Sequence, residues 1–364
     1  MRLDRLQIPE GAEDRAWQVV RAAFEERRPV PRQRRLLRPA LALAVVAVIA
    51  GLAASPPGRA VLGSLREAVG VKKAAPALFS LPAEGRLLVV SQRGPWVVQR
   101  DGSKRLLGSY RDASWSPHGL YIAATRTNEL FALDPKGNVR WSLARRKVRF
   151  PRWTGTRVDT RIAYLSGAVP RVVAGDGTSD RSLFTIRLAE PVAPAWRSGE
   201  RREVAVVALN EAVYVIDVEG CALVWRSLAL PAPRRLEWSS DGTRLLVLTR
   251  RGLVVLRRGR QVFARGRVVN AAFRPGTHDV AMIRSRGGVS ELVLGRRVLF
   301  RGTGSFRDLA WSPDGRWLVV TWPTADQWVF VRVAGERPIR GVSGITRQFG
   351  GGSFPRLAGW CCPP

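Results

Sequence analysis

Few side chains in this sequence could catalyse a reaction or hold a metal. The chain has two His and three Cys, and only Cys361 and Cys362 are neighbours. Zinc, haem and iron–sulfur sites need more ligands of these types. The sequence also contains no G-x-S-x-G elbow, no H-E-x-x-H motif, no Walker loop and no C-x-x-C pair. We therefore predict that this protein is not an enzyme, with no catalytic residue, no metal site and no cofactor.

Both His residues lie in predicted turns. His118 belongs to W-S-P-H-G, where it takes the position that Asp314 holds in W-S-P-D-G, and His278 lies in an equivalent turn. Asp241 and Asp314 each precede a Gly, a pairing typical of tight turns. We expect these side chains to shape turns, and a catalytic or ligand-binding role for either His is the alternative.

The cysteines leave their pairing open. Cys361 and Cys362 can form a disulfide with each other outside the cytoplasm, or one of them can pair with Cys221. Spacing alone does not decide between these pairings. For Cys361 at least, we favour a role as a small apolar side chain over a redox function.

The elements that position these residues come from a repeat. Past residue 80, short Val- and Leu-rich alternations are separated by Gly, Asp-Gly or Pro, as strands and hairpin turns require, and no helical stretch is visible. An aromatic residue followed by a turn and an apolar strand recurs, most clearly in W-S-P-D-G-R-W-L-V-V-T. These repeat markers, which we expect to be structural, are Trp115, Trp153, Trp196, Trp238, Phe273, Trp311 and Trp360.

The spacing of the markers predicts an all-β fold, a β-propeller. The first six are 38, 43, 42, 35 and 38 residues apart, and a period of about 40 residues with strands is typical of four-stranded propeller blades. Around Trp238 we expect strands at residues 235–238, 244–249, 253–257 and 261–265. Each blade alone leaves apolar faces bare, so a closed ring is needed.

The two ends of the repeat region complete each other. Residues 354–360 resemble the first strand of a blade that the chain does not finish, and residues 84–108 resemble three strands without a first. We predict that these segments form one shared blade. Trp115 and Trp360 are 245 residues apart over six intervals, which gives a seven-bladed propeller of antiparallel blades.

The markers at Trp238 and Trp311 carry a family resemblance. The sequences W-S-S-D-G-T-R-L-L-V-L-T and W-S-P-D-G-R-W-L-V-V-T resemble the WD-like repeats of bacterial TolB-type propellers, over about residues 80–360. The resemblance implies the propeller architecture. It implies little about function, because ligands vary within the family.

A membrane anchor is predicted before the propeller. Residues 39–54 contain no charged side chain, and with Leu36 and Leu37 a helix of nineteen residues, 36–54, would be about 28 Å long, close to the ~30 Å hydrocarbon core. Six Arg precede the span within a dozen residues and only two follow it closely. The N-terminus should therefore be cytoplasmic and the propeller extracytoplasmic. A cleaved signal peptide and a buried soluble helix are the alternatives.

A short tail precedes the span. Residues 12–28 place Trp17, Val20 and Phe24 on one stripe of a predicted helix. This stripe could contact a cytoplasmic partner, or it could rest on lipid. The expected layout is a tail (1–35), a transmembrane helix (36–55), a linker (56–79) and a propeller (80–364).

The charge is extreme, with a formal net charge of +31 and only five Lys among 60 basic residues. Such a chain attracts phosphates, anionic lipids and acidic polymers, but an extracytoplasmic propeller makes nucleic acid an unlikely partner. We predict a membrane-anchored, non-enzymatic propeller that binds a protein, peptide or cell-envelope polymer on one face, at residues that the sequence does not identify. The alternative is a transmembrane regulator, resembling membrane-bound anti-sigma proteins, whose tail binds a cytoplasmic partner.

Overall fold

A computed structural model describes residues 80–156, 159–183, 188, 192–199, 202–335 and 338–362. The predicted tail, transmembrane helix and linker lie outside these residues. Within the described part of the chain, no helix is long and apolar enough to cross a membrane.

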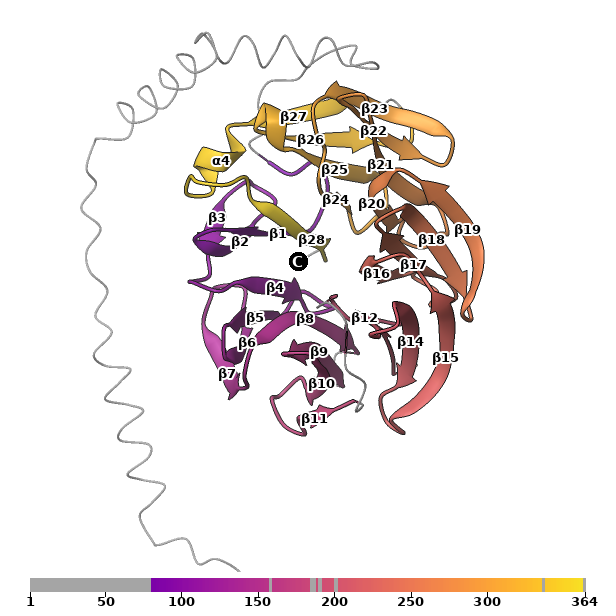
Figure 1. The fold of residues 1–364 in the computed structure, drawn as a ribbon. Helices are drawn as coiled ribbons and strands as arrows, with labels where there is room; N and C mark the ends of the chain where they lie inside the picture. Colours follow the sequence, from indigo (N-terminus) through magenta and orange to yellow (C-terminus); the bar gives the residue numbers. More distant parts are fainter. Residues whose placement is uncertain are drawn as a thin grey trace, which may run out of the picture. The chain divides into compact units, whose positions relative to one another are not determined.

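The described residues form seven antiparallel sheets of four strands each, arranged in a ring with the first strand of each sheet innermost, around an axis that we call the channel (Figure 1). This confirms the predicted seven-bladed β-propeller. From the channel outward, blade 1 contains β28 (Arg356–Cys361), β1 (Arg86–Ser91), β2 (Gly94–Val98) and β3 (Lys104–Leu106), and blade 2 contains β4 (Asp112–Trp115), β5 (Ile122–Arg126), β6 (Glu129–Leu133) and β7 (Val139–Ala144). Blade 3 contains β8 (Val148–Gly155), β9 (Thr160–Ser166), β10 (Val169–Ala174) and β11 (Arg181–Ser182). Blade 4 contains β12 (Ala195–Trp196), β13 (Glu203–Val207), β14 (Ala212–Asp217) and β15 (Ala222–Ala229).

The remaining three blades follow the same order. Blade 5 contains β16 (Pro233–Trp238), β17 (Leu245–Thr249), β18 (Gly252–Arg257) and β19 (Arg260–Gly266). Blade 6 contains β20 (Val268–Phe273), β21 (Val280–Arg286), β22 (Val289–Leu294) and β23 (Arg297–Thr303). Blade 7 contains β24 (Leu309–Trp311), β25 (Trp317–Trp322), β26 (Gln327–Arg332) and β27 (Ile339–Ser343).

Burial explains the composition of each strand. The second strands, such as β17 and β25, are buried at every position and are continuous apolar runs, because neighbouring blades cover both of their faces. Seven apolar clusters of the described residues fill the seven interfaces between neighbouring blades. The core of this protein therefore lies between blades and not inside them.

The ring closes as the sequence predicts. Strand β28 pairs antiparallel with β1, where Leu87 lies opposite Trp360 and Val89 opposite Leu357. The first strand of every blade contacts the first strands of both neighbouring blades, including β28 with β24 and β4. Figure 1 shows β28 beside β1, although the paired residues Leu87 and Trp360 are 273 residues apart in the sequence.

Two short helices differ from the prediction of strands alone. A 3₁₀ turn, η1 (Pro323–Ala325), joins β25 to β26, and a one-turn helix, α4 (Ile345–Gln348), precedes β28. The Asp326 carboxylate accepts hydrogen bonds from the Thr346 amide and hydroxyl at 2.8 and 2.6 Å, and Ile345 is buried. One carboxylate and one apolar side chain are too weak a signal to find such a helix from sequence.

The loops alternate between two faces because consecutive strands are antiparallel. We call the face with the loops from first to second and from third to fourth strands the turn face. The loops from second to third strands, and from each blade to the next, form the crossover face.

Candidate functional site

All seven repeat markers lie at or near the end of the first strand of a blade, next to the turn face. Three of the indoles bond to the preceding blade in the same way. The Nε1 groups of Trp196, Trp238 and Trp311 donate to the backbone oxygens of Arg152, Ala195 and Ala272, at 2.8, 3.1 and 3.3 Å. Each acceptor residue directly precedes a marker, so the markers connect neighbouring blades.

An arginine extends this connection. Arg274, directly after Phe273, lies over the Trp311 ring with its guanidinium carbon 5.8 Å from the ring centroid, and its Nε donates to the Gly315 oxygen at 2.9 Å. Arg197, directly after Trp196, makes the same two contacts with the next blade. The sequence analysis did not identify these arginines, although an Arg directly after a marker was the available signal.

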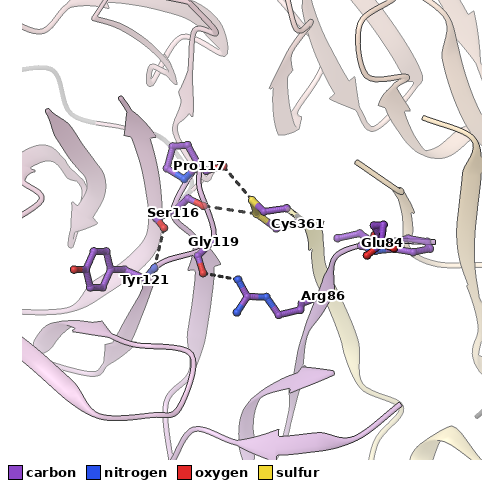
Figure 2. Close-up of a disulfide and its surroundings, with 9 residues drawn as sticks. Glu84, Arg86, Ser116, Pro117, Gly119, Tyr121 and Cys361 are labelled. Atoms are coloured by element: carbon purple, nitrogen blue, oxygen red, sulfur yellow. Dashed lines mark hydrogen bonds between the residues drawn. A yellow bond between two sulfur atoms is a disulfide. The ribbon is translucent and has the colours of Figure 1, made fainter. Parts of the chain in front are cut away.

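Arg86 makes the equivalent contacts at the ring closure. Its guanidinium carbon lies 4.9 Å from the centroid of the Trp115 ring. The guanidinium also donates to the Gly119 oxygen at 2.7 Å (Figure 2). The cation–π contact and the hydrogen bond together fasten blade 1 to blade 2. This arginine comes from the second strand and not from the residue after a marker.

The cysteines lie at the same place. Cys361 and Cys362 form a disulfide, and Cys221 is unpaired and half-buried. The two sulfur atoms lie 3.7 and 3.0 Å from the backbone oxygens of Ser116 and Pro117 (Figure 2). The disulfide therefore packs the end of β28 against a turn of blade 2, which decides among the pairings that the sequence left open.

The structure places the His and Asp residues in turns. His278 Nε2 lies 2.8 Å from Asp241 Oδ2 and bridges the turns of blades 6 and 5, whereas His118 is exposed. Asp314 accepts hydrogen bonds from the Ser312 hydroxyl and the Arg316 amide. Among the residues described, no group of three or more His, Cys, Asp or Glu could hold a metal ion.

The two faces differ in charge. In the described loops of the turn face, ten acidic residues accompany nine basic ones. The acidic residues are Glu84, Asp101, Asp134, Asp159, Asp176, Asp180, Glu219, Asp241, Asp279 and Asp314. The basic residues are Arg100, Lys136, Arg197, Arg202, Arg244, Arg258, Arg274, Arg296 and Arg316.

The described loops of the crossover face contain ten basic residues and only three acidic ones. The basic residues are Arg93, Arg111, Arg145, Arg146, Lys147, Arg250, Arg251, Arg267, Arg307 and Arg347, and the acidic residues are Glu211, Asp308 and Asp326. Arg145 pairs with Asp180 and Arg307 with Asp308. The other eight make no ion pair with a carboxylate of the described chain, so this face is strongly basic.

A pocket of about 290 Å³ opens on the crossover face between blades 2 and 3. Its wall includes the exposed basic side chains of Arg111, Lys147 and Arg149, together with Phe150. The one acidic residue in the wall, Asp112, accepts a hydrogen bond from Arg356 at 2.6 Å. The pocket therefore offers three cationic groups to a ligand.

The backbone of this pocket is unusual. Lys147 and Phe150 have φ values of 50° and 53°, in the left-handed region that non-glycine residues rarely adopt. The pairing of β8 with β9 also shifts between Arg149 and Arg152. Strained backbone of this kind is concentrated at binding sites, where the surrounding fold maintains it.

The basic character continues into the channel. Burial, with repulsion from Arg356 and Arg235, lowers the pKa of Arg152 to about 10. The Arg235 guanidinium is bonded to Asn270 and Glu237, and that of Arg356 to Asp112. The Arg152 side chain donates a hydrogen bond from Nη1 to the carbonyl oxygen of Pro151 at 2.8 Å. Arg152 can therefore attract an anion from inside the ring.

A second cavity, of about 260 Å³, lies between blades 7 and 1. Its wall is largely apolar and includes Trp328, Phe330 and Phe349. Lys104 crosses it, donating to Gln348 Oε1 at 2.7 Å and lying over the Phe349 ring. This cation already has partners within the fold, in contrast to those of the first pocket.

Comparisons with known proteins identify the fold. No family model matches the chain, and no curated protein matches it either. Among solved structures, the C-terminal WD40 domain of Sif2 has a TM-score of 0.55 at 13% identity, covering 73% of this chain and 85% of that one. Hsv2 of Kluyvelomyces marxianus has a TM-score of 0.52 at 12% identity, covering 72% and 98%. A chain of the Mitotic Checkpoint Complex has a TM-score of 0.52 at 13% identity, covering 64% and 77%.

These likenesses define a WD40-like seven-bladed propeller. At such low identity they carry the fold alone. The narrower resemblance to TolB-type repeats stays a prediction, and so do the proposed contacts of Trp17, Val20 and Phe24, which lie outside the described residues.

Proposed function

We propose that this protein is a non-enzymatic binding module, anchored in the membrane by residues 36–55, whose extracytoplasmic propeller binds an acidic segment of a protein or peptide on its crossover face. The observation that carries the proposal is the charge of that face: ten basic against three acidic loop residues, eight of the cations without an ion pair. Unpaired cations around a pocket attract carboxylates and raise the rate of their association.

The pocket supplies the specificity. Arg111 and Arg149 have planar guanidinium groups that can bind a carboxylate through two hydrogen bonds, and Lys147 adds a compact charge. Phe150 and the channel arginine Arg152 lie at the same strand, β8. A peptide with one acidic side chain in the pocket and a second toward the channel fits this arrangement.

The location outside the cytoplasm rests on the sequence. It is supported by the uncharged run at 39–54 and by the excess of Arg before it. An extracytoplasmic compartment also permits the disulfide between Cys361 and Cys362.

The test compares two triple variants with the same change in charge. R111E/K147E/R149E reverses the pocket, and K136E/R296E/R316E reverses three exposed basic residues of the turn face. After cross-linking of full chains in native membranes, the pocket variant should lose the acidic partner and the turn-face variant should retain it. Equal loss in both variants would show attraction by net charge alone, and retention in both would refute a binding role for the pocket. Recovery of an envelope polymer in place of a protein would refute the proposed ligand class.

A further inference from the structure

The outer edges of blades 4 and 5 expose an unusual share of apolar side chains. Eleven large hydrophobic residues are exposed in the described chain, and five of them lie on two neighbouring strands, β15 and β19. These five are Leu223, Val224, Leu228, Val262 and Phe263, and Leu228 is 86% exposed. We call these two strands, with the loops beside β19, the blade 4–5 rim.

The two strands form one surface. A Cβ atom on Gly259, in the turn between β18 and β19, would lie 2.4 Å from the backbone oxygen of Arg226 in β15. Figure 1 shows β15 and β19 following one another along the perimeter of the ring. Exposed apolar side chains gathered in this way mark an interaction surface.

The charge around the rim is of one sign. Residues 250–267 contain seven Arg and no acidic residue, and all seven Arg are exposed: Arg250, Arg251, Arg257, Arg258, Arg260, Arg265 and Arg267. None of them pairs with a carboxylate of the described residues. Strand β19 is exposed at all seven positions, which no other outer strand of comparable length is.

The geometry of the rim argues against an added β-strand as its occupant. The pairing of β19 with β18 shifts between Val255 and Leu256, and the pairing of β15 with β14 shifts at two places. Such bulges interrupt the row of backbone groups that a further strand would need.

We propose that the blade 4–5 rim docks on an anionic phospholipid surface. Lipid phosphates can bind the exposed guanidinium groups, and the apolar side chains of Val262, Phe263 and Leu228 can enter the region between headgroups and acyl chains. A bilayer accepts apolar side chains between cations without any shape complementarity. This contact is separate from the pocket between blades 2 and 3, although Arg250, Arg251 and Arg267 belong to the crossover face as well.

The test uses the full chain in liposomes of two compositions. One is phosphatidylcholine alone, and the other contains about one third phosphatidylglycerol, so only the second offers a strong negative surface. Amide hydrogen exchange in residues 222–229 and 260–266 should slow several-fold on the anionic liposomes, and the outer strand of blade 6, residues 297–303, should not change. High salt should remove the difference.

Two triple variants with the same change in charge distinguish lipid binding by the rim from attraction of the whole protein by its net charge. R257E/R260E/R265E should abolish the slowing, whereas R111E/K147E/R149E, with the same change in charge, should leave it intact. Equal exchange on both liposomes, or equal loss in both variants, would overturn the proposal. So would slowing that requires an added acidic peptide such as polyglutamate. If the chain does not insert, the same comparison is made with liposomes added to the chain in solution.

Discussion

The turn face and the crossover face of this ring use charge in opposite ways. On the turn face, carboxylates are hydrogen-bond acceptors within the fold: Asp241 and Asp314 close turns, and Asp180 is buried among cations. On the crossover face, most cations have no such partner. In the described loops, the acidic residues are thus concentrated on the face where they stabilise turns, and the excess of arginine lies on the other face. The positive charge of the described loops is therefore unevenly distributed over the ring.

The largest effect on stability is expected when the ring that carries both faces is opened. Deletion of residues 354–364 takes away β28, leaves β1 without its inner neighbour and exposes the apolar cluster around Trp360. We expect the cooperative thermal transition, followed by circular dichroism, to be lost. The milder Trp360→Ala should lower the free energy of unfolding by about 3–5 kcal/mol. An unchanged melting curve after the deletion would show that the ring does not depend on its shared blade.

The next prediction contrasts the two faces directly. The side chain of Asp180 is 5% exposed and accepts hydrogen bonds from Arg171, Arg145 and Tyr164. Asp180→Ala leaves these groups unpaired and should lower the free energy of unfolding by about 3–5 kcal/mol. Arg149→Ala on the crossover face should change it by less than about 0.5 kcal/mol. Denaturant unfolding measures both, and similar losses would remove the contrast.

A smaller effect is expected at the connections between blades. Arg274→Ala removes the cation over Trp311 and the hydrogen bond to Gly315, which should lower the free energy of unfolding by about 1 kcal/mol. Arg316→Ala, at an exposed turn position, serves as the control. If the two variants unfold at the same denaturant concentration, the arginine after the marker does not fasten the blades.

The smallest effect is expected in the loss of stability at acidic pH, and it involves Asp241. Partial burial opposes ionisation of Asp241, but hydrogen bonds from Ser239, Thr243 and His278 outweigh it and hold the pKa of Asp241 below its usual value. A carboxyl with a lowered folded-state pKa stabilises the fold above its unfolded pKa and loses that contribution as pH falls toward the folded value.

Between about pH 5 and pH 3, the native protein should therefore lose about 0.5–1 kcal/mol more stability than Asp241→Asn, with the partial exposure of this carboxylate keeping the difference small. Denaturant midpoints across this range measure it. Parallel pH profiles for the two proteins would contradict the proposed role of Asp241.

The fold could be predicted because the sequence features that determine it recur along the chain at regular intervals. Around Trp238, strands expected at 244–249, 253–257 and 261–265 are found at Leu245–Thr249, Gly252–Arg257 and Arg260–Gly266. Apolar alternation and Gly-containing turns fix these elements locally. The shared blade followed from the same periodicity, since a strand missing at one end was present at the other.

The candidate site could not be predicted in the same way. Arg111 and Lys147 come from the loops that lead into blades 2 and 3, and Arg149 comes from the start of β8, so their approach depends on how neighbouring blades are placed in the ring. Arg145-Arg146 and Arg250-Arg251, both on the crossover face, were the visible hint. The pairing of Cys361 with Cys362 also depended on three-dimensional placement, because residue spacing allowed other partners.

The shared blade has a consequence for how the protein is made. Six blades can be synthesised and stacked from Trp115 onward while blade 1 still lacks its innermost strand, because β28 follows every other strand of the described residues. The ring can close only after that segment has appeared, so a chain interrupted before Arg356 leaves an open edge on β1. An unpaired strand edge is open to aggregation and proteolysis, so β1 is protected only once synthesis has passed β28.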